Sequence, residues 1–242
     1  MLLRFPTSIS EAQQCLNEGA VPIGGATLVW AGWQRDGFPE QAMSLRELPA
    51  ANTVGRGTLG AAVVLHRIGA DAPEVLRGAA ATVGTGAVRR TATVGGNIVG
   101  STLRCLLPAA LVLDARATVL GPDRVYETEL AEVVAKRPLM LGLRWKDPLV
   151  SGYRKLPAEA GGPPPFVVAT AVHADGDGRR SLRVAVRDGY EVLTGRTPCD
   201  TGTGTDQVLH ALDRTDLADL PAERRAVVRD QVTDILSRLP ED

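Results

Sequence analysis

Two pairs of adjacent glycines, Gly24-Gly25 and Gly95-Gly96, place the strongest constraint on how this chain can fold. Each pair interrupts an apolar, β-prone stretch, AVPIGGATLVW and TVGGNIVGS. Glycines there cost backbone entropy and bring no side chain to pack, so both positions favour bare backbone. Two such loops lying side by side would present several N–H groups to one anion such as a diphosphate. Tight turns or β-bulges are the alternative interpretation, and spacing alone does not separate the two.

The composition is that of an ordinary globular protein. The 242 residues are 44% apolar, enough for a sizeable core, and the net charge of −1 provides no broad basic field for a nucleic acid. The apolar run 105–113 is too short to span a bilayer, and the N-terminus lacks the pattern of a signal peptide. We therefore expect no nucleic-acid partner and no membrane span.

The cysteines and histidines follow no metal-binding pattern. Cys15, Cys105 and Cys199 are scattered without Cys-x-x-Cys spacing, which argues against a disulfide framework, a zinc site or an iron–sulfur cluster. The three histidines are isolated. We expect no metal site and a reducing, cytoplasmic location.

Hydrophobic periodicity and turn signals predict a mixed α and β chain without regular βαβ alternation. Ser8 and Glu11 have the spacing of a capping box, and Gly19 ends the helix that follows. The run 161–165, GGPPP, continues neither a helix nor a strand and marks a boundary. The expected helices cover residues 8–18, 71–84, 108–113 and 227–239, and the expected strands cover 58–65, 117–120, 139–145, 166–174 and 181–187.

Residues 55–60, GRGTLG, satisfy the G-x-G-x-x-G pattern of dinucleotide-binding turns. That fingerprint requires a buried strand before it and a helix opening at its third glycine. Here Pro49 and polar residues precede the pattern, and the β-prone run AVVL follows it. We interpret the match as accidental in a chain with 26 glycines.

Several blocks in a fixed order resemble the flavin-binding subunits of molybdenum hydroxylases, a family that includes the carbon monoxide dehydrogenase and xanthine dehydrogenase flavoproteins. The similarity covers roughly residues 1–190. Its blocks are Pro6 with Glu11-Ala12, then 23–28 (IGGATL), 58–62 (TLGAA), 89–98 (RRTATVGGNI), 107–111 (LPAAL), 113–115 (LDA) and 153–156 (YRKL).

The resemblance implies an α+β fold. It consists of a two-part FAD-binding domain of the vanillyl-alcohol oxidase (PCMH) type and a small C-terminal α/β domain like that of the carbon monoxide dehydrogenase flavoprotein. The expected domains are 1–155, with subdomains 1–55 and 56–155, and 163–242. The resemblance implies FAD as cofactor, its diphosphate held by the two glycine loops. The implied FAD-binding residues are Ile23, Gly24, Gly25, Ala26, Thr27, Leu28, Thr93, Val94, Gly95, Gly96, Asn97, Ser101, Cys105, Leu141 and Lys155.

The chain departs from the family pattern just before its Leu-Pro block. The resemblance implies a Ser-Asp pair there, its acid near the sugar-like chain of the flavin, but this sequence has Arg104-Cys105. Loss of that acceptor would weaken FAD binding unless Ser101 or Thr102 compensates, and Arg104 itself is expected to be a solvated surface charge. Lys155 matches a lysine near the flavin ring, with an exposed strand end as the alternative.

The resemblance therefore implies an FAD-binding oxidoreductase subunit. Its implied partners are a large molybdopterin subunit and a small [2Fe-2S] subunit, and electrons would pass to a small-molecule acceptor such as oxygen or a nicotinamide. No general acid or base is evident in the sequence. One alternative is a stand-alone flavoenzyme acting on a small organic molecule, and another is a degenerate scaffold that no longer holds FAD.

Overall fold

The structure, a computed structural model, describes residues 1–157 and 161–240 and contains two compact units. Unit 1 comprises residues 1–72, 83–106 and 115–145, and unit 2 comprises 73–82, 107–114 and 146–242. The units therefore interleave along the chain. The sequence-based boundaries, 1–155 and 163–242, stay predictions, and residues 241–242 lie outside the described part.

Unit 1 holds two sheets. The first is three-stranded and parallel in the order β1-β3-β2, and the second is antiparallel in the order β4-β5-β8-β6-β7. The strands are β1 (Leu2–Arg4), β2 (Val21–Ile23), β3 (Gln41–Ser44), β4 (Val54–Gly55), β5 (Thr58–Gly60), β6 (Arg116–Leu120), β7 (Val125–Glu129) and β8 (Leu139–Arg144). The helices are α1 (Ile9–Asn17), α2 (Val29–Asp36), α4 (Gly86–Arg89), α6 (Leu130–Lys136), a π-helix (Gly96–Gly100) and 3₁₀ turns at Leu45–Glu47, Pro49–Ala51 and Leu65–Arg67.

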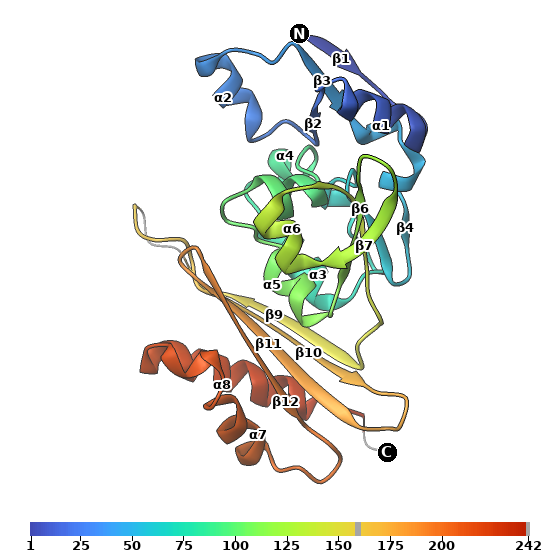
Figure 1. Ribbon diagram of the computed structural model, residues 1–242. Coiled ribbons are helices and arrows are strands. Elements are labelled where there is room, and N and C mark those ends of the chain that lie inside the picture. Colours follow the sequence, from blue (N-terminus) through green and yellow to red (C-terminus); the bar gives the residue numbers. More distant parts are fainter. Residues whose placement is uncertain (158–160, 241–242) are drawn as a thin grey trace. The chain divides into compact units, whose positions relative to one another are not determined.

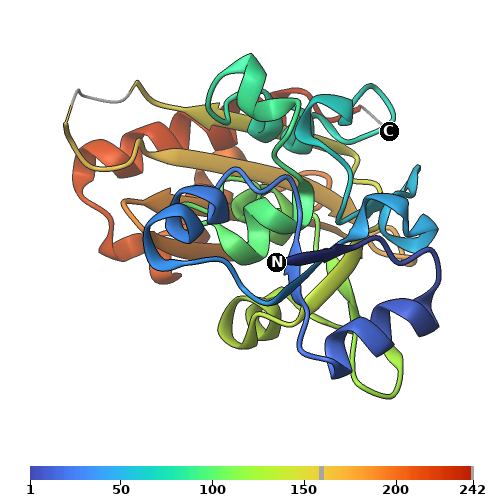
Figure 2. The same ribbon diagram turned by 90° about the horizontal axis from the view of Figure 1, so that it is seen from above.

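Helix α1 forms where its caps predict it. The Ser8 hydroxyl accepts a hydrogen bond from the Glu11 N–H, and the chain leaves the helix through Gly19 at φ +82°. Ala12 and Cys15 are buried on one face of α1. Figures 1 and 2 show α1 and α2 on opposite sides of the three-stranded sheet.

Helix α2 lies where the sequence predicted no helix, and its first two residues belong to the stretch interpreted as β-prone. None of its residues is buried, although Val29, Trp30 and Trp33 have the spacing of one helical face. Trp30 meets Phe38 edge-to-face at 5.4 Å between ring centroids, and Phe38 also lies 6.0 Å from Trp33. These ring contacts hold the chain after α2 back against the helix.

Unit 2 is one antiparallel sheet in the order β12-β11-β10-β9 with helices on both faces. Every residue from Val167 to Val172 in β10 is buried, because both faces of this central strand are covered. Residues 175–179 join β10 to β11 in a short turn, in agreement with the two predicted strands 166–174 and 181–187. The elements are β9 (Val150–Lys155), β10 (Val167–Ala174), β11 (Arg180–Asp188), β12 (Glu191–Pro198), α3 (Glu74–Ala81), α5 (Leu107–Val112), α7 (Thr205–Leu212), α8 (Ala222–Ser237) and a 3₁₀ turn at Asp216–Asp219.

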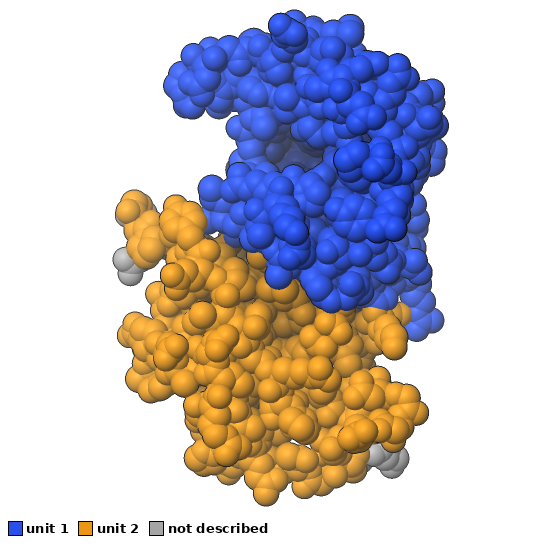
Figure 3. Space-filling view, viewed as in Figure 1, with its two compact units in different colours: residues 1–72, 83–106, 115–145 blue, residues 73–82, 107–114, 146–242 orange. Residues whose placement is uncertain are grey.

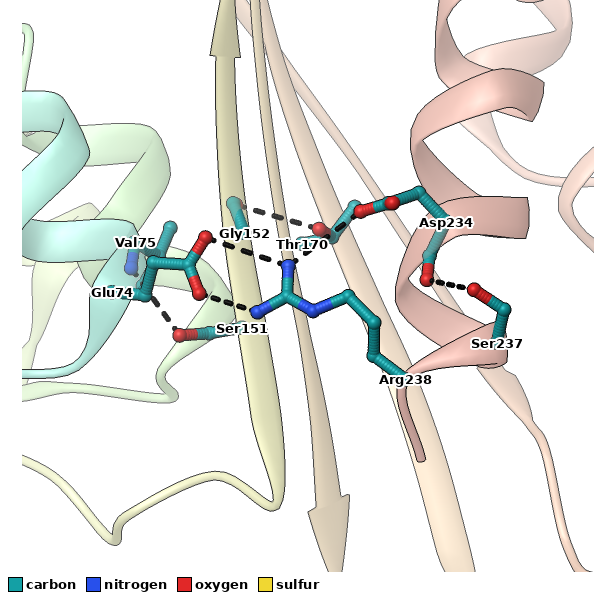
Figure 4. A network of polar contacts seen from close by, with 8 residues as sticks. All are labelled: Glu74, Val75, Ser151, Gly152, Thr170, Asp234, Ser237 and Arg238. Atoms are coloured by element: carbon teal, nitrogen blue, oxygen red, sulfur yellow. Dashed lines mark hydrogen bonds and ion pairs between the residues drawn. The ribbon is translucent and has the colours of Figure 1, made fainter. Parts of the chain in front are cut away.

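Polar contacts from two helices meet at strand β9 (Figure 4). The Val75 N–H in the first turn of α3 donates to Oγ of the buried Ser151, at 3.2 Å. Glu74 pairs with Arg238, which follows α8 and also lies 3.5 Å from Asp234. An exposed ion pair contributes little, whereas a buried hydrogen bond is worth about 0.5–1.5 kcal/mol. Ser151 is therefore the stronger link between α3 and the sheet.

In the core of unit 2, α8 packs its apolar face on the sheet. We predict that Ile235→Ala, which empties a fully buried position, lowers the free energy of unfolding by about 2–5 kcal/mol in urea denaturation. Leu236→Ala on the next, only partly buried position is the matched control and should cost clearly less. Equal losses for the two variants would contradict this assignment of the buried face.

Candidate functional site

The first glycine loop connects β2 to α2 through residues 24–28. Within the described part of the chain, the backbone N–H groups of these residues have no protein acceptor, although the Ala26 carbonyl accepts from Trp30 N–H at 3.1 Å. Ala26 takes a left-handed conformation, φ +56°, which is uncommon for a residue with a Cβ. A run of unpaired N–H groups around a left-handed residue is typical of anion-binding nests.

Bare backbone lets this loop press against residues 91–93. A Cβ on Gly24 would lie 2.2 Å from Oγ1 of Thr93, and one on Gly25 would lie 1.7 Å from the carbonyl oxygen of Thr91. Neither contact is possible for a side-chain carbon. The structure therefore brings the two glycine segments together. Contact between the segments is possible only because Gly24 and Gly25 have no side chains.

The Thr93 side chain lies between the two glycine pairs. Its Oγ1 accepts a hydrogen bond from the Gly96 N–H at 3.2 Å, and a Cβ on Gly96 would approach that oxygen to 3.1 Å. Thr93 is buried, so this hydroxyl is part of the joint between the segments.

The backbone N–H groups of the second glycine segment donate hydrogen bonds to carbonyl groups of the protein. Val94 N–H donates to Val63 O at 3.0 Å, Gly95 N–H to Ala61 O at 2.8 Å, and Asn97 N–H to Thr93 O at 2.9 Å. Gly95 must be bare because a Cβ would lie 2.9 Å from the Ala61 Cβ. Of the two segments, the first has the unpaired N–H groups for an anion, whereas the second supplies the surface on which that loop rests.

The π-helix Gly96–Gly100 follows directly, and its wide turn is a feature frequently found at functional sites. Asn97 Oδ1 accepts a hydrogen bond from the Leu106 N–H at 2.8 Å, and Ser101 Oγ accepts one from the Leu103 N–H at 3.2 Å. Both predicted FAD-binding side chains thus fold residues 101–106 back on the helix. Cys105 in this segment is buried.

Arg104 is not the solvated surface charge that the sequence suggested. Its Nε is buried, and its backbone φ is +39°. The residue as a whole is half-buried, so its side chain is partly enclosed by the protein and partly in contact with solvent.

The other predicted residues are placed differently. Leu141 is buried in a cluster with Leu45, Leu48 and Leu120, where its packing accounts for its apolar character. Lys155 ends β9 in unit 2, and its Nζ donates to the Thr82 carbonyl at 2.8 Å. The assignment of both as FAD-binding residues stays a prediction. Phe166, at the start of the predicted strand 166–174, is buried in the unit 2 core.

The G-x-G-x-x-G match at 55–60 does not form a dinucleotide-binding turn. Strands β4 and β5 pair antiparallel across it, with Val54 opposite Leu59 and Gly55 opposite Thr58. Gly57 takes φ +70° in the two-residue turn. The prediction that this match is accidental is confirmed.

Unit 1 is hollowed on the face drawn in Figure 3. The hollow lies where Figure 1 labels β2 above and α4 below, the elements that flank the two glycine segments. A concave surface beside unpaired N–H groups fits a ligand that carries a diphosphate.

Burial shifts the pKa values of two side chains in unit 2, Cys199 and His173. Burial raises the pKa of the Cys199 thiol to about 11, so this thiol stays protonated at neutral pH. Burial likewise lowers the pKa of His173, whose Nε2 lies 2.8 Å from the Val112 carbonyl. These environments favour the uncharged forms and are typical of structural side chains.

Comparison with known proteins identifies the class. Residues 3–142 match the family described as FAD binding domain in molybdopterin dehydrogenase. The chain belongs to this family, and its cofactor is FAD. No curated protein matches the sequence significantly.

Solved structures support the fold over nearly the whole chain. A chain of the Cu,Mo-CO dehydrogenase in its cyanide-inactivated form aligns with TM-score 0.70 and 18% identity, covering 99% of this chain and 97% of that one. A chain of quinoline 2-oxidoreductase from Pseudomonas putida 86 aligns with TM-score 0.67 and 17% identity, covering 99% and 96%. The predicted fold class and family are confirmed.

We predict that Gly25→Ala lowers the FAD content of the purified protein severalfold, because the added methyl must push the loop off the Thr91 carbonyl. The visible absorbance of bound flavin per polypeptide measures this content. Gly32→Ala in α2 is the matched control, since its Cβ meets nothing within 4 Å and it should retain FAD. Full flavin content in Gly25→Ala would contradict the requirement for bare backbone.

Proposed function

We propose that the chain is the FAD-binding subunit of a multi-subunit oxidoreductase and that residues 24–28 hold the FAD diphosphate. The observation that carries the proposal is the run of N–H groups at these positions, which has no acceptor among the described residues. Hydrogen bonds from N–H groups to an anionic oxygen are stronger than those to a neutral acceptor. A diphosphate supplies such oxygens at the right spacing for a short loop.

The remaining predicted residues have supporting roles in this proposal. Gly95 and Gly96 leave the surface beside the loop free of side chains, and Thr93 fixes the distance between the two segments. Asn97 and Ser101 shape the segment 101–106 next to them. When bound, FAD supplies the electron-transfer chemistry, while the chain binds and orients it.

The proposed electron donor is a partner carrying molybdenum and iron–sulfur centres, and the proposed acceptor is a small molecule such as oxygen or a nicotinamide. The support is the family, whose description names a molybdopterin dehydrogenase, and the whole-chain likeness to a chain of a Cu,Mo enzyme. No helix in the described residues is long and apolar enough to cross a membrane. A cytoplasmic location remains a prediction from the cysteine pattern.

Gly96→Val tests the loop assignment. We predict that it removes most bound FAD and leaves the circular dichroism spectrum unchanged, because the branched side chain covers the surface beside residues 24–28 and only Thr93 must yield. Gly69→Val controls for the substitution itself, since the nearest atom to its Cβ lies at 3.9 Å. Wild-type flavin content in Gly96→Val would refute the assignment of this surface to FAD.

Copurification tests the partner assignment. Expression of the tagged chain with its genomic neighbours should yield a yellow complex that contains molybdenum and iron, measured by elemental analysis. A yellow monomer or homodimer that oxidises a small organic molecule would favour the stand-alone flavoenzyme instead. A colourless chain that takes up no added FAD would favour the degenerate scaffold.

A further inference from the structure

Arg104 combines two costs that the folded chain does not compensate. Its φ of +39° is a conformation that a residue with a Cβ adopts only under constraint. Its Nε is buried without a hydrogen-bond partner, and no described residue forms a hydrogen bond or ion pair with its side chain. The residue as a whole is half-buried, so its charge stays partly hydrated, but an anion from outside the chain would supply the acceptor that the buried Nε lacks.

The position of Arg104 points to the source of that anion. Asn97 and Ser101 fold residues 101–106 back on the π-helix through bonds to Leu106 and Leu103. The last residue of the π-helix, Gly100, faces the first glycine loop, since a Cβ on it would lie 3.8 Å from Leu28 Cδ1. Arg104 thus belongs to a segment that adjoins the loop with unpaired N–H groups.

Charge adds a second, independent argument. The family resemblance implies a Ser-Asp pair at the positions of Arg104 and Cys105. The substitutions remove one negative charge and add one positive charge, so both make the site more favourable for an anion. A guanidinium presents planar, paired donors that match two phosphate oxygens.

We propose that Arg104 is an anion-binding residue of the cofactor site and that it pairs with a phosphate of FAD. This inference rests on the proposed function of residues 24–28. It assigns the loop N–H groups and the guanidinium to the same diphosphate.

The test separates the phosphates from the rest of the flavin. Apo protein is titrated with FAD and with riboflavin, which has the same ring and no phosphate, and binding is followed by flavin fluorescence. Arg104→Gln should raise the Kd for FAD about tenfold or more while leaving that for riboflavin within about twofold. Arg104→Lys should recover part of the FAD affinity. The loss of the charge should also make FAD binding less sensitive to salt.

A second variant reports on the backbone. Arg104→Gly removes both the unpaired cation and the left-handed strain, so the apo protein should melt at a higher temperature although it binds FAD more weakly. Arg46→Gln is the matched control, because Arg46 is an exposed arginine of the same unit. This control should change neither the FAD affinity nor the melting temperature.

Three outcomes would overturn the inference: unchanged FAD affinity in Arg104→Gln, equal losses for FAD and riboflavin, or a lower apo melting temperature in Arg104→Gly. If the wild-type chain and Arg104→Gln bind FAD equally well, only the role of Arg104 is refuted. A wild-type chain that binds no FAD refutes the proposed function as well.

Discussion

The contact of Thr93 with Gly24 and Gly96 is the constraint on which the site depends. The Thr93 hydroxyl accepts a hydrogen bond from the Gly96 N–H. The same hydroxyl lies so close to Gly24 that a Cβ on Gly24 would be 2.2 Å from Thr93 Oγ1. Because Gly25 also packs against the Thr91 carbonyl, the loop that follows β2 is held by residues that are distant in sequence. These contacts fix the loop without using the N–H groups of residues 24–28, so the N–H groups are preorganised for a ligand.

Local signals were sufficient for the elements that carry them. The capping residues of α1, the apolar face of α3 and α8, and the turn between β10 and β11 all lie within short stretches of sequence, so the sequence predicted each of them. Helix α2 was missed because its first residues, Val29 and Trp30, continue the β-prone stretch 20–30, which hid the start of the helix. Strand β12 was missed because only Gly195 and Thr197 are buried along it. The π-helix depends on contacts with residues distant in sequence, which no local pattern reveals.

The sequence indicated which segments form the candidate site, but it did not show why the glycines are needed there or which N–H groups are unpaired. The glycine pairs alone left an anion-binding loop and a tight turn open, and bare backbone at Gly24, Gly25 and Gly95 is already required by contacts within the protein. Glycine pairs therefore did not distinguish a binding loop from a tight turn, and the family resemblance made that distinction. The unpaired N–H groups of the first loop, which are visible only in three dimensions, are the feature that a ligand would use.

The state of these groups links cofactor binding to stability. The left-handed backbone of Ala26 and Arg104 and the unsatisfied Nε of Arg104 each raise the free energy of the folded chain, by about 1–3 kcal/mol for a strained residue or an unsatisfied buried donor. A ligand that satisfies them binds the folded chain and not the unfolded one, so its binding adds directly to stability. The residues concerned belong to unit 1, whereas the sheet of unit 2 is covered on both faces and has its own core. Under the proposed function, cofactor binding would therefore stabilise unit 1 more than unit 2.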